Sequence, residues 1–186
     1  MSTSIHIDRY SLNPYGYLSR LYTQTSSSTP VTNTTVETSL LDGGLGTLTV
    51  PANQFKVGDS FHAVLTGHLS SINNHNLQIR IKTGSIVLAD TGLIGMGNAT
   101  GKHWKLEVDF TIRAIGASGV ASIAAGGAFF YTKNAATTFE GTNFSTETTT
   151  GFDTTISNTL SITAQWGTAN AGDSIYSEIF TLNKTY

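Results

Sequence analysis

The sequence predicts an all-β fold, a jelly-roll β-sandwich with an extended N-terminal arm. Three segments, residues 77–82, 104–113 and 160–166, alternate apolar and polar side chains almost without interruption. A period of two is the pattern of a β-strand that buries one face and exposes the other. No segment shows the 3.6-residue period of an amphipathic helix.

Turn residues divide the chain beyond residue 34 into a series of strands. Gly43 and Gly44 follow the first strand, and Pro51 ends the second because proline cannot donate to a ladder. The expected strands are residues 36–41, 46–50, 60–69, 77–82, 86–91, 103–115, 120–131, 154–157, 159–166 and 174–184. We expect a glycine-rich loop over residues 92–101 and one irregular strand within the Thr-rich residues 133–153. Short strands of uneven length favour a sandwich over a repeat array.

The alternating pattern also places the two tryptophans. Trp104 shares its strand face with Leu106, Val108, Phe110 and Ile112, and Trp166 shares its face with Leu160, Ile162 and Ala164. A one-residue slip would expose each whole set, so the register is strongly specified. We therefore expect both tryptophans in the core.

The composition break near residue 34 predicts two regions, an arm and linker over residues 1–34 and the jelly-roll domain over residues 35–186. The arm carries Tyr10, Tyr15, Tyr17 and Tyr22, and a Ser/Thr-rich linker leads to Pro30. Disordered segments are usually poor in aromatic residues, so we interpret these tyrosines as a partner-binding arm. The alternative is a disordered tail.

The composition also excludes several classes of function. Of 186 residues, 39% are hydrophobic and 12% are charged, and the net charge is −2. There is no basic stripe for nucleic acid, no apolar run as long as a membrane span and no signal-peptide pattern at the N-terminus. The chain has no cysteine, which excludes disulfides and cysteine-ligated zinc.

Titratable residues do not form a recognisable catalytic motif. His62, His68 and His75 are interpreted as surface histidines, with a metal or pH-sensitive role across a subunit interface as the alternative. Glu107 and Asp109 share a strand face with basic neighbours, which favours a charge-balanced surface over a catalytic carboxylate pair. We therefore expect no enzyme activity, no cofactor and no metal.

The strand expected at residues 120–131 consists largely of small residues, which include Ala121, Ala124, Ala125, Gly126 and Ala128. Alanine and glycine are poor strand formers, and glycine in a strand often marks the close approach of another backbone. We expect these five residues to form the interface of a homotrimer. The alternative is a strand that faces a bulky partner sheet within one subunit.

Three stretches together resemble a β-domain of viral structural proteins. They are residues 48–59 (LTVPANQFKVGD), 104–113 (WKLEVDFTIR) and 160–175 (LSITAQWGTANAGDSI). A similar order and spacing occurs in tail, fibre and head-surface proteins of tailed bacteriophages and other large DNA viruses, and the resemblance covers residues 36–186. It implies a structural role, a jelly roll like those of trimeric viral head domains, and no catalytic residues.

The sequence thus predicts a virion structural protein: a minor capsid, decoration or fibre-head subunit that is located in the virion and acts by assembly. Its expected partners are further copies of itself and other capsid or tail proteins, bound through the arm. The alternative is a glycan- or receptor-binding β-sandwich that binds a glycan on the host surface. A β-fold hydrolase is a third interpretation.

Overall fold

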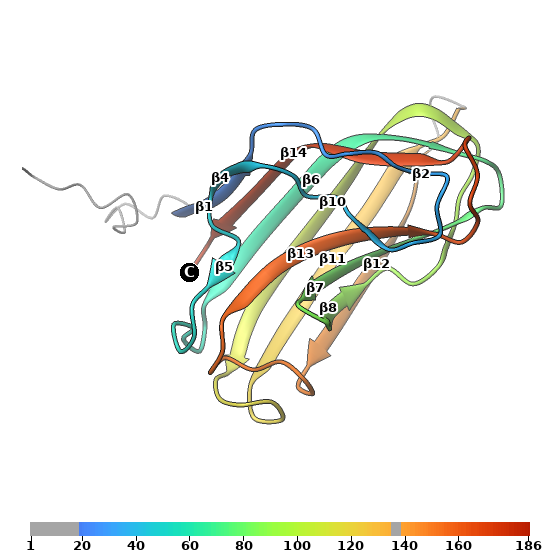
Figure 1. Cartoon of the computed structure of the whole chain (residues 1–186). Coiled ribbons are helices and arrows are strands. Elements are labelled where there is room, and N and C mark those ends of the chain that lie inside the picture. Colours follow the sequence, from blue (N-terminus) through green and yellow to red (C-terminus); the bar gives the residue numbers. More distant parts are fainter. Residues whose placement is uncertain (1–18, 135–138) are drawn as a thin grey trace, which may run out of the picture.

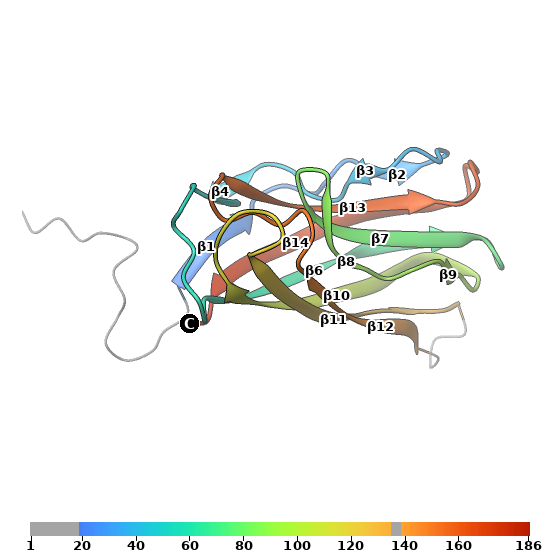
Figure 2. The same cartoon turned by 90° about the horizontal axis from the view of Figure 1, so that it is seen from below.

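The computed structural model describes residues 19–134 and 139–186, which form fourteen strands and no helix. The strands make two antiparallel sheets that face each other as two layers (Figures 1 and 2). The predicted all-β sandwich is therefore confirmed. Tyr10, Tyr15 and Tyr17, which were assigned to the arm, lie outside the described residues.

The larger sheet has eight strands. In order across the sheet, seven of them are β12 (Phe139–Thr148), β11 (Ser122–Thr132), β10 (Ala99–Ala114), β6 (Ser60–Ser71), β14 (Ser174–Lys184), β1 (Ser19–Gln24) and β4 (Gly44–Gly46). The eighth, β2 (Val31–Thr32), pairs with β14. β12 is thus the outermost strand on the side away from β1 and β4 (Figure 1).

The smaller sheet has six strands. Four of them follow the order β3 (Thr38–Ser39), β13 (Asn158–Trp166), β7 (Asn76–Thr83) and β8 (Ile86–Asp90). Two short strands complete the sheet, because β5 (Thr49–Val50) pairs with β13 and β9 (Ile94–Gly95) pairs with β7.

The chain crosses between the sheets so that early strands pair with late ones. β6 pairs with β14 in the larger sheet, and β7, which follows β6, pairs with β13, which precedes β14. The β7–β13 pair therefore lies between β6 and β14 in the sequence, as in a long hairpin whose two halves lie in different sheets. However, β10 also pairs with β6 and β12 pairs with β11, which gives one large sheet. The topology therefore establishes a β-sandwich without the finer jelly-roll description.

The core lies between the two sheets, where buried residues alternate along β6, β7 and β10. Trp104 and Trp166 are both fully buried, as predicted. The Trp166 indole N–H donates to the Val31 carbonyl oxygen at 2.9 Å, and the Trp104 indole N–H donates to two backbone carbonyl groups. These bonds satisfy the one polar atom that each side chain brings into the core.

Residues 19–34 belong to the sandwich, which differs from their assignment to the arm and linker. β1 pairs with both β14 and β4, so it is hydrogen-bonded along both edges. Tyr22 is buried, and its hydroxyl donates to the Asp42 carbonyl oxygen at 2.6 Å. Ser28 is buried as well. Its backbone N–H donates to the Ser177 carbonyl oxygen, and its hydroxyl accepts the Ser177 backbone N–H. Hydroxyl side chains that resemble a linker in sequence thus serve here as internal hydrogen-bond partners.

Three other segments differ from expectation. β12 is a regular strand of ten residues, and its pairing with β11 shows no register shift. Residues 154–157 form no strand, because the Asp153 carboxylate accepts the Thr155 backbone N–H at 2.8 Å and closes a turn. Residues 36–41 contain only the two-residue strand β3.

Candidate functional site

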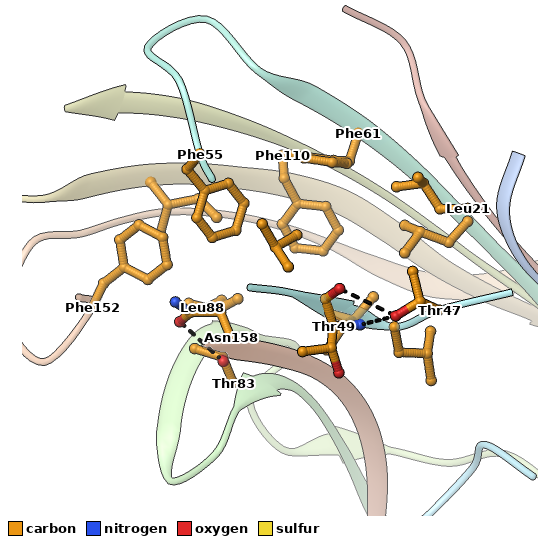
Figure 3. A pocket seen from close by; sticks show the side chains of 15 residues that line it. Leu21, Thr47, Thr49, Phe55, Phe61, Thr83, Leu88, Phe110, Phe152 and Asn158 are labelled. Atoms are coloured by element: carbon orange, nitrogen blue, oxygen red, sulfur yellow. Dashed lines mark hydrogen bonds between the residues drawn. The ribbon is translucent and has the colours of Figure 1, made fainter. Parts of the chain in front are cut away.

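The two sheets enclose an apolar cavity near the end of the sandwich where β14 ends. Its volume is about 90 Å³. Phe55, Phe110 and Phe152 lie on one side of it, and the hydrogen-bonded pair Thr83 and Asn158 lies on the other (Figure 3). None of its lining residues is an acid, a histidine, a lysine or an arginine. The cavity therefore suits a small apolar group and offers no acid or base for catalysis.

Loops at the same end of the sandwich expose apolar side chains. The exposed residues are Val57, Ile115, Val120 and Ile156. Backbone hydrogen bonds hold two of these loops together, from Thr154 to Gly116 at 2.9 Å and from Gly119 to Thr149 at 3.0 Å. We call this surface the apolar end. Contiguous exposed apolar patches mark surfaces that contact another macromolecule, and these four side chains lie on loops at one end of the sandwich.

The small residues predicted to form an oligomer interface are divided between two faces. Ala121 and Ala125 are buried in the core of the subunit, so neither is accessible to another copy. Ala124, Gly126 and Ala128 are half-buried on the outer face of the larger sheet. β11 is paired with β10 on one edge and β12 on the other, so its backbone edges are also occupied.

Large neighbouring side chains explain the small residues on the inner face of β11. Ala125 lies opposite Phe110 of β10, and Gly127 lies opposite Phe144 of β12. A Cβ atom on Gly127 would clash first with the backbone carbonyl oxygen of Glu107 on β10, and it would also lie 2.9 Å from the Phe144 ring. These neighbours belong to the same sheet of the same subunit, so the close packing on this face is internal to the subunit.

A polar cluster ties β12 to the loop before β10. The Tyr131 hydroxyl donates to Glu140 at 2.8 Å and accepts the backbone N–H of Gly97 at 2.6 Å. Burial raises the pKa of Tyr131 to about 12, so the phenol stays protonated at neutral pH. The hydrogen bond from Lys133 lowers the pKa of Glu140, so that carboxylate stays ionised. At neutral pH the Tyr131 hydroxyl therefore remains the donor and the Glu140 carboxylate remains the acceptor, so the hydrogen bond between them is maintained.

Each of the three histidines singled out in the sequence lies beside a carboxylate. The pairs are His62 with Asp109, His68 with Glu178 and His75 with Asp173, at nitrogen–oxygen distances of 2.8, 3.0 and 2.6 Å. Asp173 is fully buried and also accepts the Ile72 backbone N–H, so it joins two loops. Within the described ranges, no three acidic or histidine side chains lie close enough together to hold a metal ion.

Charged side chains on the outer faces of both sheets are paired. On the larger sheet, Glu107 forms an ion pair with Lys105, in agreement with the predicted charge-balanced surface. On the smaller sheet, Glu37 accepts hydrogen bonds from Lys82 at 2.9 Å and from Arg80 at 3.0 Å. The bond from Lys82 is the main reason that the pKa of Glu37 is lowered.

Two features of the described structure have little signal in the sequence. The cavity depends on Phe55 and Phe152, which lie in loops where no periodicity predicts burial. β12 consists mostly of Thr, Ser, Asn and Gly, which also fill loops. Its two phenylalanines, Phe139 and Phe144, are five residues apart and lie on opposite faces, so the sequence has no apolar alternation that would separate a strand from a loop.

Comparisons with protein-family models, with curated proteins and with solved structures found no match for this chain. In the part of the chain that the structure describes, no helix is long and apolar enough to cross a bilayer. Proposals about function therefore depend on the surfaces and on the resemblance given above.

Proposed function

We propose that this chain is a structural subunit of a virus particle, a minor capsid, decoration or fibre-head protein that acts by assembly. The three stretches that resemble viral β-domains contribute to a single sandwich, because they include β5, most of β10 and most of β13. Trp104 and Trp166, one from each of two stretches, are buried in one core. This supports the resemblance as one of a whole domain.

The observation that carries the proposal is the apolar end. Val57, Ile115, Val120 and Ile156 remain exposed there although the loops that hold them are ordered. Exposing apolar surface to water is unfavourable, and contact with a neighbouring subunit in a particle would remove that cost. The apolar cavity beneath the loops has no chemical groups that suggest a competing catalytic role.

The proposed partners are other capsid or tail proteins and further copies of the chain. The described structure shortens the proposed anchoring arm to residues 1–18, which carry Tyr10, Tyr15 and Tyr17. A trimer remains our proposal for self-association, now through the outer-face residues Ala124, Gly126 and Ala128. Ala121 and Ala125 no longer belong to that interface because the subunit buries them.

Mass spectrometry of gradient-purified particles, from cells that produce this protein, tests the proposal. We expect the chain to co-sediment with the major capsid protein at a fixed ratio and to be labelled on particles by a specific antibody in electron microscopy. A soluble host protein of similar abundance serves as the control. A chain that stays in the soluble fraction while the particles lack it would contradict the proposal.

A glycan-binding function is the second candidate, favoured by a hollow beside β12. The hollow has a volume of about 560 Å³ and lies between residues 91–95 and the start of β12. Phe139 is 71% exposed at its edge, next to the polar side chains of Glu140 and Thr142. An exposed ring beside hydrogen-bonding groups suits a sugar. A glycan array with the wild type and Phe139→Ala separates the two functions, because only a lectin loses signal in the variant.

A further inference from the structure

We propose that β12 is a self-association site, at which the β12 strands of two copies pair antiparallel about a two-fold axis. The pairing would join two large sheets into one continuous sheet. This contact goes beyond the proposed virion role, because it depends only on the edge of the sheet. It is also separate from the outer face of β11, which the proposed trimer uses.

β12 is the one long strand edge left unpaired among the described residues. It has ten residues, and its only strand partner is β11. The other sheet edges are β4, β3 and β8, with three, two and five residues. Proteins commonly protect a sheet edge by keeping it short, and these three edges follow that rule. β12 does not, so it presents a row of backbone donors and acceptors to another chain.

β12 also lacks the side chains that usually block edge pairing. It contains no proline and no lysine, and its register with β11 is continuous over all ten residues. A lysine, a proline or a bulge would have disfavoured a second strand at this edge. β12 lies beside β8 of the facing sheet, and at its last residue the Thr148 hydroxyl lies 3.4 Å from the carbonyl oxygens of Val87 and Leu88. Among the described residues, no backbone hydrogen bond joins residues 140–147 to the facing sheet.

The two acidic residues of β12 are neutralised within the subunit. Glu140 forms an ion pair with Lys133. Glu147 forms one with Arg113 at 2.8 Å and also accepts a hydrogen bond from Ser122 at 2.7 Å. Two copies of this edge can therefore meet without repulsion between unpaired carboxylates.

The two-fold geometry also keeps these glutamates apart. An axis perpendicular to the sheet leaves every residue on its own face, so an even-numbered residue always lies opposite an even-numbered one. Glu140 and Glu147 have opposite parity and never face each other in such a pair. With the axis at Asn143, Gly141 lies opposite Ser145; with the axis at Phe144, Asn143 lies opposite Ser145. The axis at Asn143 places Thr142 opposite Phe144, and the axis at Phe144 places the two Phe144 rings opposite each other, so each register also gives an apolar contact.

Cysteine cross-linking tests the pairing, because the wild-type chain has no cysteine. In either register the two copies of residue 143 lie directly opposite or one diagonal step apart, within reach of a short bis-maleimide. Asn143→Cys at micromolar concentration should give a covalent dimer of twice 19.7 kDa. The matched control is Ile179→Cys, which is also an exposed position, on β14 in the interior of the same sheet. It should stay monomeric on a denaturing gel.

A lysine on the edge gives the second arm of the experiment. Ser145→Lys in the Asn143→Cys background should abolish the cross-link, because two lysines near the axis repel each other and lysine disfavours edge pairing. Thr146→Lys, on the other face of the strand, should have the same effect if Ser145→Lys fails to fold. Circular dichroism confirms the fold of each variant.

Three results would overturn the proposal: no cross-link for Asn143→Cys, equal cross-linking of the control, or a cross-link that survives lysine at both edge positions. Asn143 and Ser145 lie beside Ala128 and Gly126 of the proposed trimer surface, so Thr146→Lys, on the opposite face of β12, is the variant that isolates the edge contact. Absence of the chain from virus particles would refute the proposed function and leave the pairing intact, so the two failures are distinguishable.

Discussion

At the scale of single residues, buried aromatic side chains with one polar atom connect the two sheets. Trp166 is fully buried on β13, and its indole N–H donates to Val31 beside β14 of the other sheet. We expect Trp166→Ala to lower the free energy of unfolding by about 3–5 kcal/mol, the usual cost of removing a large aromatic side chain from a core. Urea unfolding measures this change.

Trp166→Phe keeps most of the apolar area but removes the indole donor to the Val31 carbonyl group, at a cost of about 1–3 kcal/mol. A loss below about 1 kcal/mol in the alanine variant would contradict the assigned burial.

Glu37 gives a prediction on acid stability. Its pKa is lowered, first by the hydrogen bond from Lys82 and next by that from Thr163. A carboxyl group whose pKa is lower in the folded chain contributes stability above its unfolded pKa of about 4.3 and loses that contribution as the pH falls through the folded value. We therefore expect the stability gap between the wild type and Glu37→Gln to close below about pH 4. Thermal melts from neutral to acidic pH measure it, and a gap that does not change with pH would contradict the ionic role.

At the scale of elements, we predict that the folded domain begins at β1. β1 fills the place between β14 and β4, and β2 supplies the carbonyl group that Trp166 binds. Deletion of residues 1–18 should leave a chain that melts cooperatively, whereas deletion of residues 1–34 should unfold it. Under the proposed function, the shorter deletion should also abolish incorporation into particles. A folded chain without residues 1–34 would show that β1 and β2 are dispensable.

The elements also show which features the sequence could predict. β6, β7, β10 and β13 alternate over most of their length because each buries one face, and all four were predicted as strands. The expected glycine-rich loop at residues 92–101 was too long, because it contains β9 and the first residues of β10. β1, β2 and β12 have polar or small side chains, so their strand structure depends on backbone pairing with neighbours that a single sequence does not specify. The small residues of β11 indicated close packing correctly. The groups that pack against Gly127 are the Glu107 backbone of β10 and the Phe144 ring of β12, and the sequence alone does not bring them together.

At the scale of the whole molecule, the surfaces differ in what they can bind. The outer face of the smaller sheet carries the paired charges of Glu37, Arg80 and Lys82, which satisfy one another. The apolar end, the outer face of β11 and the edge of β12 do not have such internal partners for their exposed groups. A subunit with a three-fold and a two-fold contact can extend into a lattice, since the two symmetries together link every copy to several others. This gives the proposed trimer and the proposed edge pairing separate roles in assembly.

The three-fold contact can be tested apart from the two-fold one. In a Thr146→Lys background, which removes the proposed edge pairing from the face of β12 opposite to the trimer surface, we expect light scattering at micromolar concentration to give three times 19.7 kDa. Adding Ala128→Arg should reduce this to the mass of one chain, because arginine places bulk and charge on the half-buried outer face of β11. Thr181→Arg, on the outer face of β14 in the same sheet, is the matched control and should keep the trimer. A monomeric parent would refute the trimer, as would a trimer that tolerates arginine at position 128.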